Sequence, residues 1–398
     1  MTYTKLDKSN LKKEIGILEI ERHPPVLVTF CKIFKTKETN VTVFTTKKIF
    51  DRIKIQLKNL DEYKFVIKPE RQKPSSFLKK VKKYCNKNID LLFVNTIHET
   101  IFDLARYLNF NPKCRKVLTI HHVNAWLKPN LIFKPKKIIG TVNTNLSLPL
   151  IKFILPRYDG INVIYSPLKD YIKKNLDIKK KIFTFPSSIF ELEHITKKDL
   201  DMVTIVVPGL IQKHRKNFEI IIPVFKNLFN LHSNKIKVFI LGRAVDSYGQ
   251  NIQKEFENLK KRGYNIVTYD HFVKEKTFQK VIRESDIILA PIRIESKADN
   301  EIKEYYGKTV GSGIIYNAIK FTKPIIVPSE FIMLKELETS TLKYDDFYEL
   351  EKILTDYIKK PEIRKKLSFE AVKNAKNFSL GKLQEYFKDE ALEWLKGP

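Results

Sequence analysis

The feature that most restricts the fold of this chain is an alternation, nearly from end to end, of short β-branched apolar runs with longer helical patterns. Runs such as Ile15–Ile20, Lys64–Ile67 and Leu91–Asn95 are each followed by a segment with helical periodicity. Strands that alternate with helices pair in parallel, because each helix carries the chain back across the sheet. The sequence therefore predicts an α/β protein built from doubly wound, Rossmann-like sheets.

The length of 398 residues is enough for two domains of ordinary size. A polar stretch at 191–201 interrupts the alternation and precedes a fresh strand at Val203–Val207. We predict an N-terminal domain at 1–190, a linker at 191–201, a second Rossmann-like domain at 202–380, and a C-terminal helix at 381–398 that crosses back to the first domain. Two such domains would face each other across a cleft at the carboxyl ends of both sheets, where open α/β sheets bind ligands.

The net charge of +29 favours a polyanionic partner such as nucleic acid, an anionic membrane or a phosphorylated substrate. Only 12 of the 74 basic residues are arginine, so the charge fits a solvated lysine-rich face equally well. No RNP, zinc-finger or helix-turn-helix pattern accompanies it. Nucleic acid is therefore the weaker prediction for a partner.

The sequence predicts a cytoplasmic protein. No apolar run reaches the roughly 18 residues of a membrane-spanning helix, and the first residues lack the apolar core of a signal peptide. The apolar run at 145–158, flanked by basic residues, would allow peripheral attachment to the inner face of an anionic membrane, although a core helix explains it as well. Cys31, Cys85 and Cys114 form no CxxC pair, so neither a disulfide framework nor a zinc site is indicated.

Two loops of the second half have the composition of phosphate-binding turns. "GKTVGSG", Gly307–Gly313, leads into a predicted helix, and its glycines would let backbone amides approach a ligand at the helix amino terminus. "VVPGLIQKHRKN" turns at Gly209 and gathers Lys213, Arg215 and Lys216 before another helix. Each motif alone also suits an ordinary turn. Two of them on one sheet edge predict a diphosphate site.

These pieces, in this order, resemble the two-domain GT-B nucleotide-sugar glycosyltransferases, and most closely family 4 of the glycosyltransferases. The resemblance rests on the basic loop, on "KVFILG", on "ESDIILAP" and on "AIKFTKPIIV", with "NFSLGKLQEYF" as the closing helix. It spans most of the chain and implies the GT-B architecture. It places the donor diphosphate near Gly209, Arg215, Lys216, Lys308, Ser312 and Gly313, and the base beside the backbone of Phe272 and Val273.

The chain departs from the family pattern where two glutamates commonly stand eight positions apart, because it has Thr309 and Asn317 there. Some members carry a K-T-S-G-like turn instead, and "GKTVGSG" is closer to those, so Thr309 joins the predicted donor contacts. The departure leaves the donor sugar and the retaining or inverting mechanism open. The segment Glu295–Tyr306 is longer than usual and is predicted to be a lid.

Histidines follow several predicted strands of the first half. His121, at the end of Val117–Ile120, occupies a position where family members frequently have a histidine near the transferred sugar. An imidazole there would hydrogen-bond the sugar or carry the acceptor proton, so we predict that His121 is catalytic. His98 and His23 also follow strands and are candidates for the acceptor side.

The resemblance implies a hexosyltransferase-like enzyme that moves a sugar from a UDP- or GDP-sugar to a hydroxyl of a glycan or lipid-linked acceptor, in cell-surface polysaccharide or glycoconjugate synthesis. It implies no cofactor and no metal, since the nucleotide sugar is itself the donor substrate. Two alternatives remain. One is a nucleotide-sugar 2-epimerase of the same fold, which would need carboxylates converging on the sugar; the other is a basic nucleic-acid-binding protein without catalysis.

Overall fold

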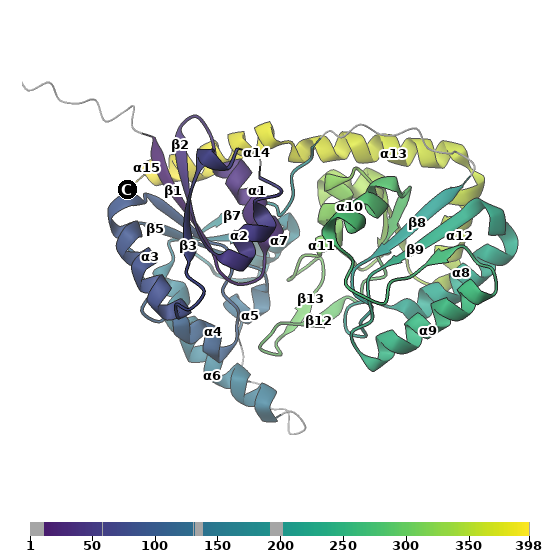
Figure 1. Cartoon of the computed structure of the whole chain (residues 1–398), viewed down its shortest axis with the longest axis horizontal. Helices are drawn as coiled ribbons and strands as arrows, with labels where there is room; N and C mark the ends of the chain where they lie inside the picture. Colours follow the sequence, from purple (N-terminus) through teal and green to yellow (C-terminus); the bar gives the residue numbers. More distant parts are fainter. Residues whose placement is uncertain (1–11, 58, 130, 132–137, 192–201, 398) are drawn as a thin grey trace, which may run out of the picture.

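The computed structural model describes residues 12–57, 59–129, 131, 138–191 and 202–397. Within this part of the chain, two separate parallel sheets are each covered by helices on both faces (Figure 1). The predicted α/β class with two doubly wound sheets is therefore confirmed. Apart from Glu191, the predicted linker at 191–201 lies outside the described residues.

The first sheet has the strand order β3-β2-β1-β4-β5-β6-β7, with every neighbouring pair parallel. Its strands are β1 (Lys13–Glu19), β2 (Thr39–Thr46), β3 (Tyr63–Lys68), β4 (Leu91–Val94), β5 (Arg115–Ile120), β6 (Gly160–Val163) and β7 (Lys181–Phe183). Its helices are α1 (Pro24–Phe34), α2 (Lys47–Ile53), α3 (Pro74–Asn88), α4 (Ile101–Arg106), α5 (Val123–Leu127), α6 (Ile138–Ile154) and α7 (Ser166–Asn175). The central strands are buried on both faces, which is why they read as continuous apolar runs.

The second sheet has the order β10-β9-β8-β11-β14-β15, again parallel throughout. Its strands are β8 (Val203–Pro208), β9 (Ile236–Leu241), β10 (Ile266–Val267), β11 (Ile287–Leu289), β14 (Ile325–Pro328) and β15 (Thr341–Tyr344). Its helices are α8 (Phe218–His232), α9 (Ser247–Lys261), α10 (Glu275–Glu284), α11 (Gly313–Lys320), α12 (Phe347–Lys359) and α13 (Pro361–Ala375). Between β11 and α11 an antiparallel hairpin is inserted, formed by β12 (Glu295–Lys297) and β13 (Lys303–Tyr305).

The C-terminal helices run from the second domain back to the first, along one side of the molecule (Figure 1). Helices α14 (Leu380–Phe387) and α15 (Glu393–Lys396) follow α13. Gln384 Nε2 donates to the carbonyls of Lys32 and Lys35 at the end of α1, at 3.1 and 2.7 Å, and the rings of Phe387 and Phe34 stack at 4.6 Å. These contacts fasten the end of the chain to the first sheet. Among the described residues, no helix combines the length and apolarity needed to cross a bilayer.

Candidate functional site

The β12–β13 hairpin of the second domain lies between the two domains (Figure 1) and docks on the first. Its Ala298 and Ile302 form one buried apolar cluster with Ala125 of α5 and Leu148 of α6. The segment predicted to be a lid, 295–306, is therefore an ordered hairpin that is seated on the first domain in this structure.

Glu304 of the hairpin binds the start of α5. Its side chain is fully buried, and it accepts hydrogen bonds from the backbone amides of Ala125 at 2.8 Å and Asn124 at 3.3 Å. Burial raises the pKa of Glu304 to about 7, against the hydrogen bonds that favour its charged form. The amide of Val123 donates to the carbonyl of Thr309 at 2.9 Å. The hairpin and the loop with the predicted donor residues are therefore both hydrogen-bonded to the start of α5 in the first domain.

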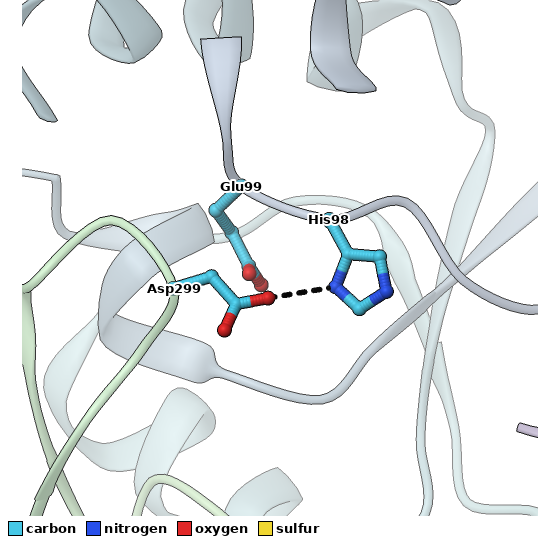
Figure 2. Close-up of side chains that lie close together, drawn as sticks. All are labelled: His98, Glu99 and Asp299. Atoms are coloured by element: carbon cyan, nitrogen blue, oxygen red, sulfur yellow. Dashed lines mark ion pairs between the residues drawn. The ribbon is translucent and has the colours of Figure 1, made fainter. Parts of the chain in front are cut away.

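His98, Glu99 and Asp299 form a second junction between the domains (Figure 2). His98 Nδ1 lies 3.0 Å from Asp299 Oδ2, and Arg22 Nη1 lies 3.5 Å from the same oxygen. The hydrogen bond to His98 lowers the pKa of Asp299 to about 2. One potential ligand atom from each of His98, Glu99 and Asp299 lies within 4.8 Å of the other two, so these residues could hold a divalent cation.

Glu99 also contacts α5 and the residue before it. Its side chain is 2% exposed, and its Oε1 accepts from Trp126 Nε1 at 2.9 Å and lies 3.1 Å from His122 Nδ1. Burial alone would lower the pKa of His122, but the charge and hydrogen bond of Glu99 outweigh it and raise this pKa to about 9. His122 is therefore an imidazolium at neutral pH.

This ion pair predicts a loss of stability in mild alkali. The pKa of His122 is higher in the folded chain, so its contribution is complete below the ordinary value of 6.5 and is lost as the pH rises through about 9. We expect the difference in unfolding free energy between wild type and His122→Gln to shrink by about 2 kcal/mol between pH 7 and pH 10. Urea unfolding at both pH values measures it. A constant difference would mean that the pair is screened by solvent.

His121 lies at the carboxyl end of β5, beside two residues that follow β4. Its Nε2 is 3.0 Å from the carbonyl oxygen of Asn95 and 3.4 Å from Thr96 Oγ1. Glu19 in turn accepts from Thr96 Oγ1 at 2.7 Å and from Asn95 Nδ2 at 2.8 Å, which fixes both neighbours. Burial lowers the pKa of His121 to about 4, so the ring is neutral at pH 7.

The three histidines singled out in the sequence lie together at this edge. The rings of His23 and His121 stack at 4.2 Å, and the rings of His23 and His98 are 6.5 Å apart. Burial lowers the pKa of His23 to about 2. A polar edge of the first sheet thus presents neutral imidazoles next to the charged junction of His98 and Asp299.

On the second domain, Gly209 begins the loop after β8 with φ at +95°, a conformation that favours glycine. Its amide donates to the carbonyl of Leu241 at 2.9 Å, and the amide of Ile211 donates to Arg243 at 3.0 Å. Gly242 lets the two loops meet, because a Cβ there would lie 2.5 Å from the Gly209 carbonyl carbon and closer still to its oxygen. The loops after β8 and β9 thus form one tightly packed turn.

Lys216 and Arg215 of the same loop point in different directions. The Lys216 side chain is buried, and its Nζ donates to the carbonyls of Pro208 and Gly209. Burial lowers the pKa of Lys216 to about 7, and the nearby charge of Arg215 contributes to the shift. Arg215 is exposed. Lys216 thus supports the Gly209 turn from inside, whereas Arg215 is accessible to a ligand.

The first and last glycines of the "GKTVGSG" loop differ in backbone conformation and in exposure. Gly307 has φ at +80°, and its amide donates to the carbonyl of Val310 at 2.9 Å. Ser312 is the N-cap of α11 and accepts from the amide of Ile314 at 3.4 Å. Gly313 is exposed, and a Cβ at this position would meet nothing within 4 Å. The amino terminus of α11 is therefore open next to its cap.

This loop faces the first domain. Lys308 Nζ lies 5.7 Å from the ring centroid of Tyr171 on α7, and a Cβ at Gly311 would lie 3.3 Å from Cβ of Tyr165. Both candidate loops also border the segment 292–294, since Lys216 pairs with Ile292 and the amide of Tyr306 donates to Ile294 at 2.8 Å. The structure thus brings the two predicted loops onto one rim of the second sheet.

Phe272 and Val273 lie in the loop after β10, the outer strand on the far side of β8 from β11. Phe272 is 67% exposed, whereas Val273 is buried. Val273 belongs to the main hydrophobic core, whereas no contact in the described part of the chain gives Phe272 a role. Their place beside a nucleotide base remains a prediction.

Sequence reasoning missed four carboxylates of this region: Glu19, Glu99, Asp299 and Glu304. Glu19 ends β1 and Glu99 comes shortly after β4, so the rule that parallel sheets place polar groups at their carboxyl ends would have found both. Asp299 and Glu304 belong to the hairpin, and their partners lie in the other domain. No local pattern predicts such a pairing.

No family model matches the chain, and no curated protein matches it. Solved structures match it over nearly its whole length. A glycosyltransferase from Rickettsia africae aligns at 13% identity and a TM-score of 0.61, covering 97% of this chain and 98% of that chain. HepE of Anabaena, in complex with UDP, aligns at 10% identity and a TM-score of 0.61, covering 96% and 100%. A UDP-forming α,α-trehalose-phosphate synthase from Burkholderia vietnamiensis aligns at 10% identity and 0.57, covering 97% and 100%.

Likenesses at such low identity establish the fold. The chain has the two-domain GT-B architecture of these enzymes, as the sequence predicted. They do not single out family 4.

Proposed function

We propose that the chain is a glycosyltransferase, similar to family 4, that moves a sugar from a nucleoside-diphosphate donor to a hydroxyl of a glycan or lipid-linked acceptor. One observation carries the proposal: two glycine turns with exposed cations lie on the rim of the second sheet that is joined to the histidine edge of the first. Neighbours of the same fold that contain or form UDP favour a uridine nucleotide over a guanosine nucleotide.

The electrostatic demand of this reaction is met by the second domain. Transfer breaks the bond between the anomeric carbon and the diphosphate, so negative charge grows on the leaving group. The open amino terminus of α11 at Gly313, the hydroxyl of Ser312 and the cations of Arg215 and Lys308 would neutralise it. On this proposal the nucleotide sugar is a substrate, and no separate cofactor takes part.

His121 would contact the transferred sugar. Its low pKa makes it a poor general base, whereas a neutral ring whose Nε2–H donates to Asn95 leaves Nδ1 free to accept from a sugar hydroxyl. A positioning hydrogen bond is therefore the better role for His121 than proton transfer.

The two alternatives find less support. The carboxylates near the histidines, Glu99, Asp299 and Glu304, are already paired with histidines or backbone amides, which does not suit the converging acids of a 2-epimerase. A nucleic-acid module would not need the glycine turns.

We propose that the positive charge of the chain attracts it to the inner face of an anionic membrane. There it would take part in cell-surface polysaccharide or glycoconjugate synthesis.

Gly313→Ala tests the nucleotide site with little effect on the fold. A Cβ at Gly313 meets no atom within 4 Å, so we expect wild-type stability, but it would cover the amides offered to the diphosphate. UDP at 100 times its dissociation constant should stabilise the wild type by about 2.7 kcal/mol, and we expect most of this gain to disappear in the variant. Thermal shift with UDP and GDP measures both.

Gly381→Ala is the matched control, because a Cβ there also meets nothing within 4 Å and the residue lies on α14, far along the chain from the loops. A wild-type protein that neither UDP nor GDP stabilises would contradict the proposed function. Equal stabilisation of all three proteins by UDP would move the diphosphate away from α11.

A further inference from the structure

A basic pocket lies beside the histidine edge, at the carboxyl ends of β1, β2 and β3. It has a volume of about 570 Å³, the size of a small-molecule site. Five basic side chains line it: Arg22, Lys47, Lys48, Arg52 and Lys68. Only two carboxylates, Glu21 and Glu70, belong to the same lining. The pocket therefore carries a net positive charge within a small, concave volume.

Two of these cations are available to a ligand. Lys47 pairs with Asp51 at 3.0 Å. The ammonium of Lys68 donates to backbone carbonyls, and the shortest of these hydrogen bonds is 2.8 Å, to the carbonyl of Gln72. Lys48 and Arg52 are exposed, and neither has an ion pair with any residue that the structure describes. They are four positions apart on α2, so their side chains share one helix face. A guanidinium and an ammonium on one helix face suit the oxygens of a phosphate group.

The pocket adjoins the proposed reaction centre. The loop between β1 and α1 forms the wall between them: Arg22 and Pro24 line the pocket, while the ring of His23 stacks on His121 at 4.2 Å. Arg22 also reaches Asp299 of the second-domain hairpin, at 3.5 Å. The pocket and the proposed reaction centre therefore lie on the two sides of this loop.

We propose that this basic pocket binds a phosphate group of the acceptor. This proposal rests on the proposed function. The acceptor is then a phosphorylated sugar or a lipid with a phosphorylated head group. The pocket fixes the charged end, and the hydroxyl that receives the sugar lies on the histidine side of the loop.

The test uses the full-length chain and three phosphate ligands: inorganic phosphate, glucose 6-phosphate with glucose as its uncharged match, and vesicles with phosphatidylglycerol against vesicles of phosphatidylcholine. Lys48→Ala/Arg52→Ala should weaken binding of whichever phosphate ligand the wild type binds by at least about tenfold, since each charge-assisted hydrogen bond is worth about that factor. Lys79→Ala/Lys83→Ala removes the same charge from α3, outside the pocket lining, and should leave the affinity unchanged. Lys48→Glu, a single exposed change, repeats the test if the double variant is unstable.

The outcomes separate the pocket from the nucleotide site. Selective loss in the pocket variants supports the inference, and the ligand that is lost tells a sugar phosphate from a lipid head group. Equal loss in the α3 variant, or no phosphate binding by the wild type, overturns it. UDP stabilisation, measured on the same proteins, should be unchanged in the pocket variants. If UDP fails to bind while selective phosphate binding remains, the pocket stands and the proposed function falls.

Discussion

Gly242→Ala is expected to lower the free energy of unfolding by about 3 kcal/mol and to remove most of the binding of UDP. The added Cβ would lie 2.5 Å from the carbonyl carbon of Gly209 and 3.0 Å from the amide nitrogen of Leu210. Both are backbone atoms, so no side-chain rotation relieves the overlap. The loops after β8 and β9 must separate, and the Gly209 turn that is proposed to face the diphosphate moves with them.

Urea unfolding gives the change in stability. The thermal shift caused by UDP gives the change in binding, and the temperature scan starts where the variant is still folded. Gly16→Ala is an informative comparison, because the three atoms nearest to its Cβ would all belong to side chains of the first-domain core, with Leu92 the nearest at 2.9 Å. That variant should lose stability but keep its affinity for UDP. A Gly242→Ala protein that binds UDP as tightly as the wild type would remove the β8 loop from the proposed site.

The elements that periodicity predicted are those whose pattern is set by burial within one domain. Strands such as β4 and β5 are buried on both faces, so their sequences are apolar throughout and are easily recognised. The β12–β13 hairpin has strands of three residues and the polar sequence "ESKADNEIKEYY". Its burial comes from the opposite domain, through Ala125 and Leu148, and that contact leaves no period in the local sequence.

The meeting of the two candidate loops was predictable in outline, because loops that follow parallel strands lie at one edge of their sheet. The direction of each side chain was not. Lys216 and Arg215 are neighbours with the same charge, yet Lys216 is buried on two carbonyls and Arg215 is exposed. Likewise, nothing local predicts that His122 pairs with Glu99 and becomes charged while His121 stays neutral. These differences depend on which groups the fold brings within 3 to 4 Å.

His121→Ala is expected to reduce kcat about 100-fold with little change in UDP binding, because a hydrogen bond to the reacting sugar is lost while the diphosphate contacts remain. The measurement is release of UDP from whichever UDP-sugar stabilises the wild type, with water or the acceptor receiving the sugar. His232→Ala is the control, since His232 ends α8, which returns from the carboxyl edge of the second sheet to the opposite edge. It should keep the wild-type rate.

The pH dependence of this loss distinguishes the two roles of an imidazole. With a pKa of about 4, His121 stays neutral over the working range, so a positioning hydrogen bond predicts the same ratio of wild-type to variant kcat at pH 6 and pH 8. A general base that titrates near the ordinary histidine value would instead make the ratio rise severalfold across this interval. A rising ratio would show that the ring exchanges protons during transfer, and an unchanged kcat in His121→Ala would place the transferred sugar elsewhere.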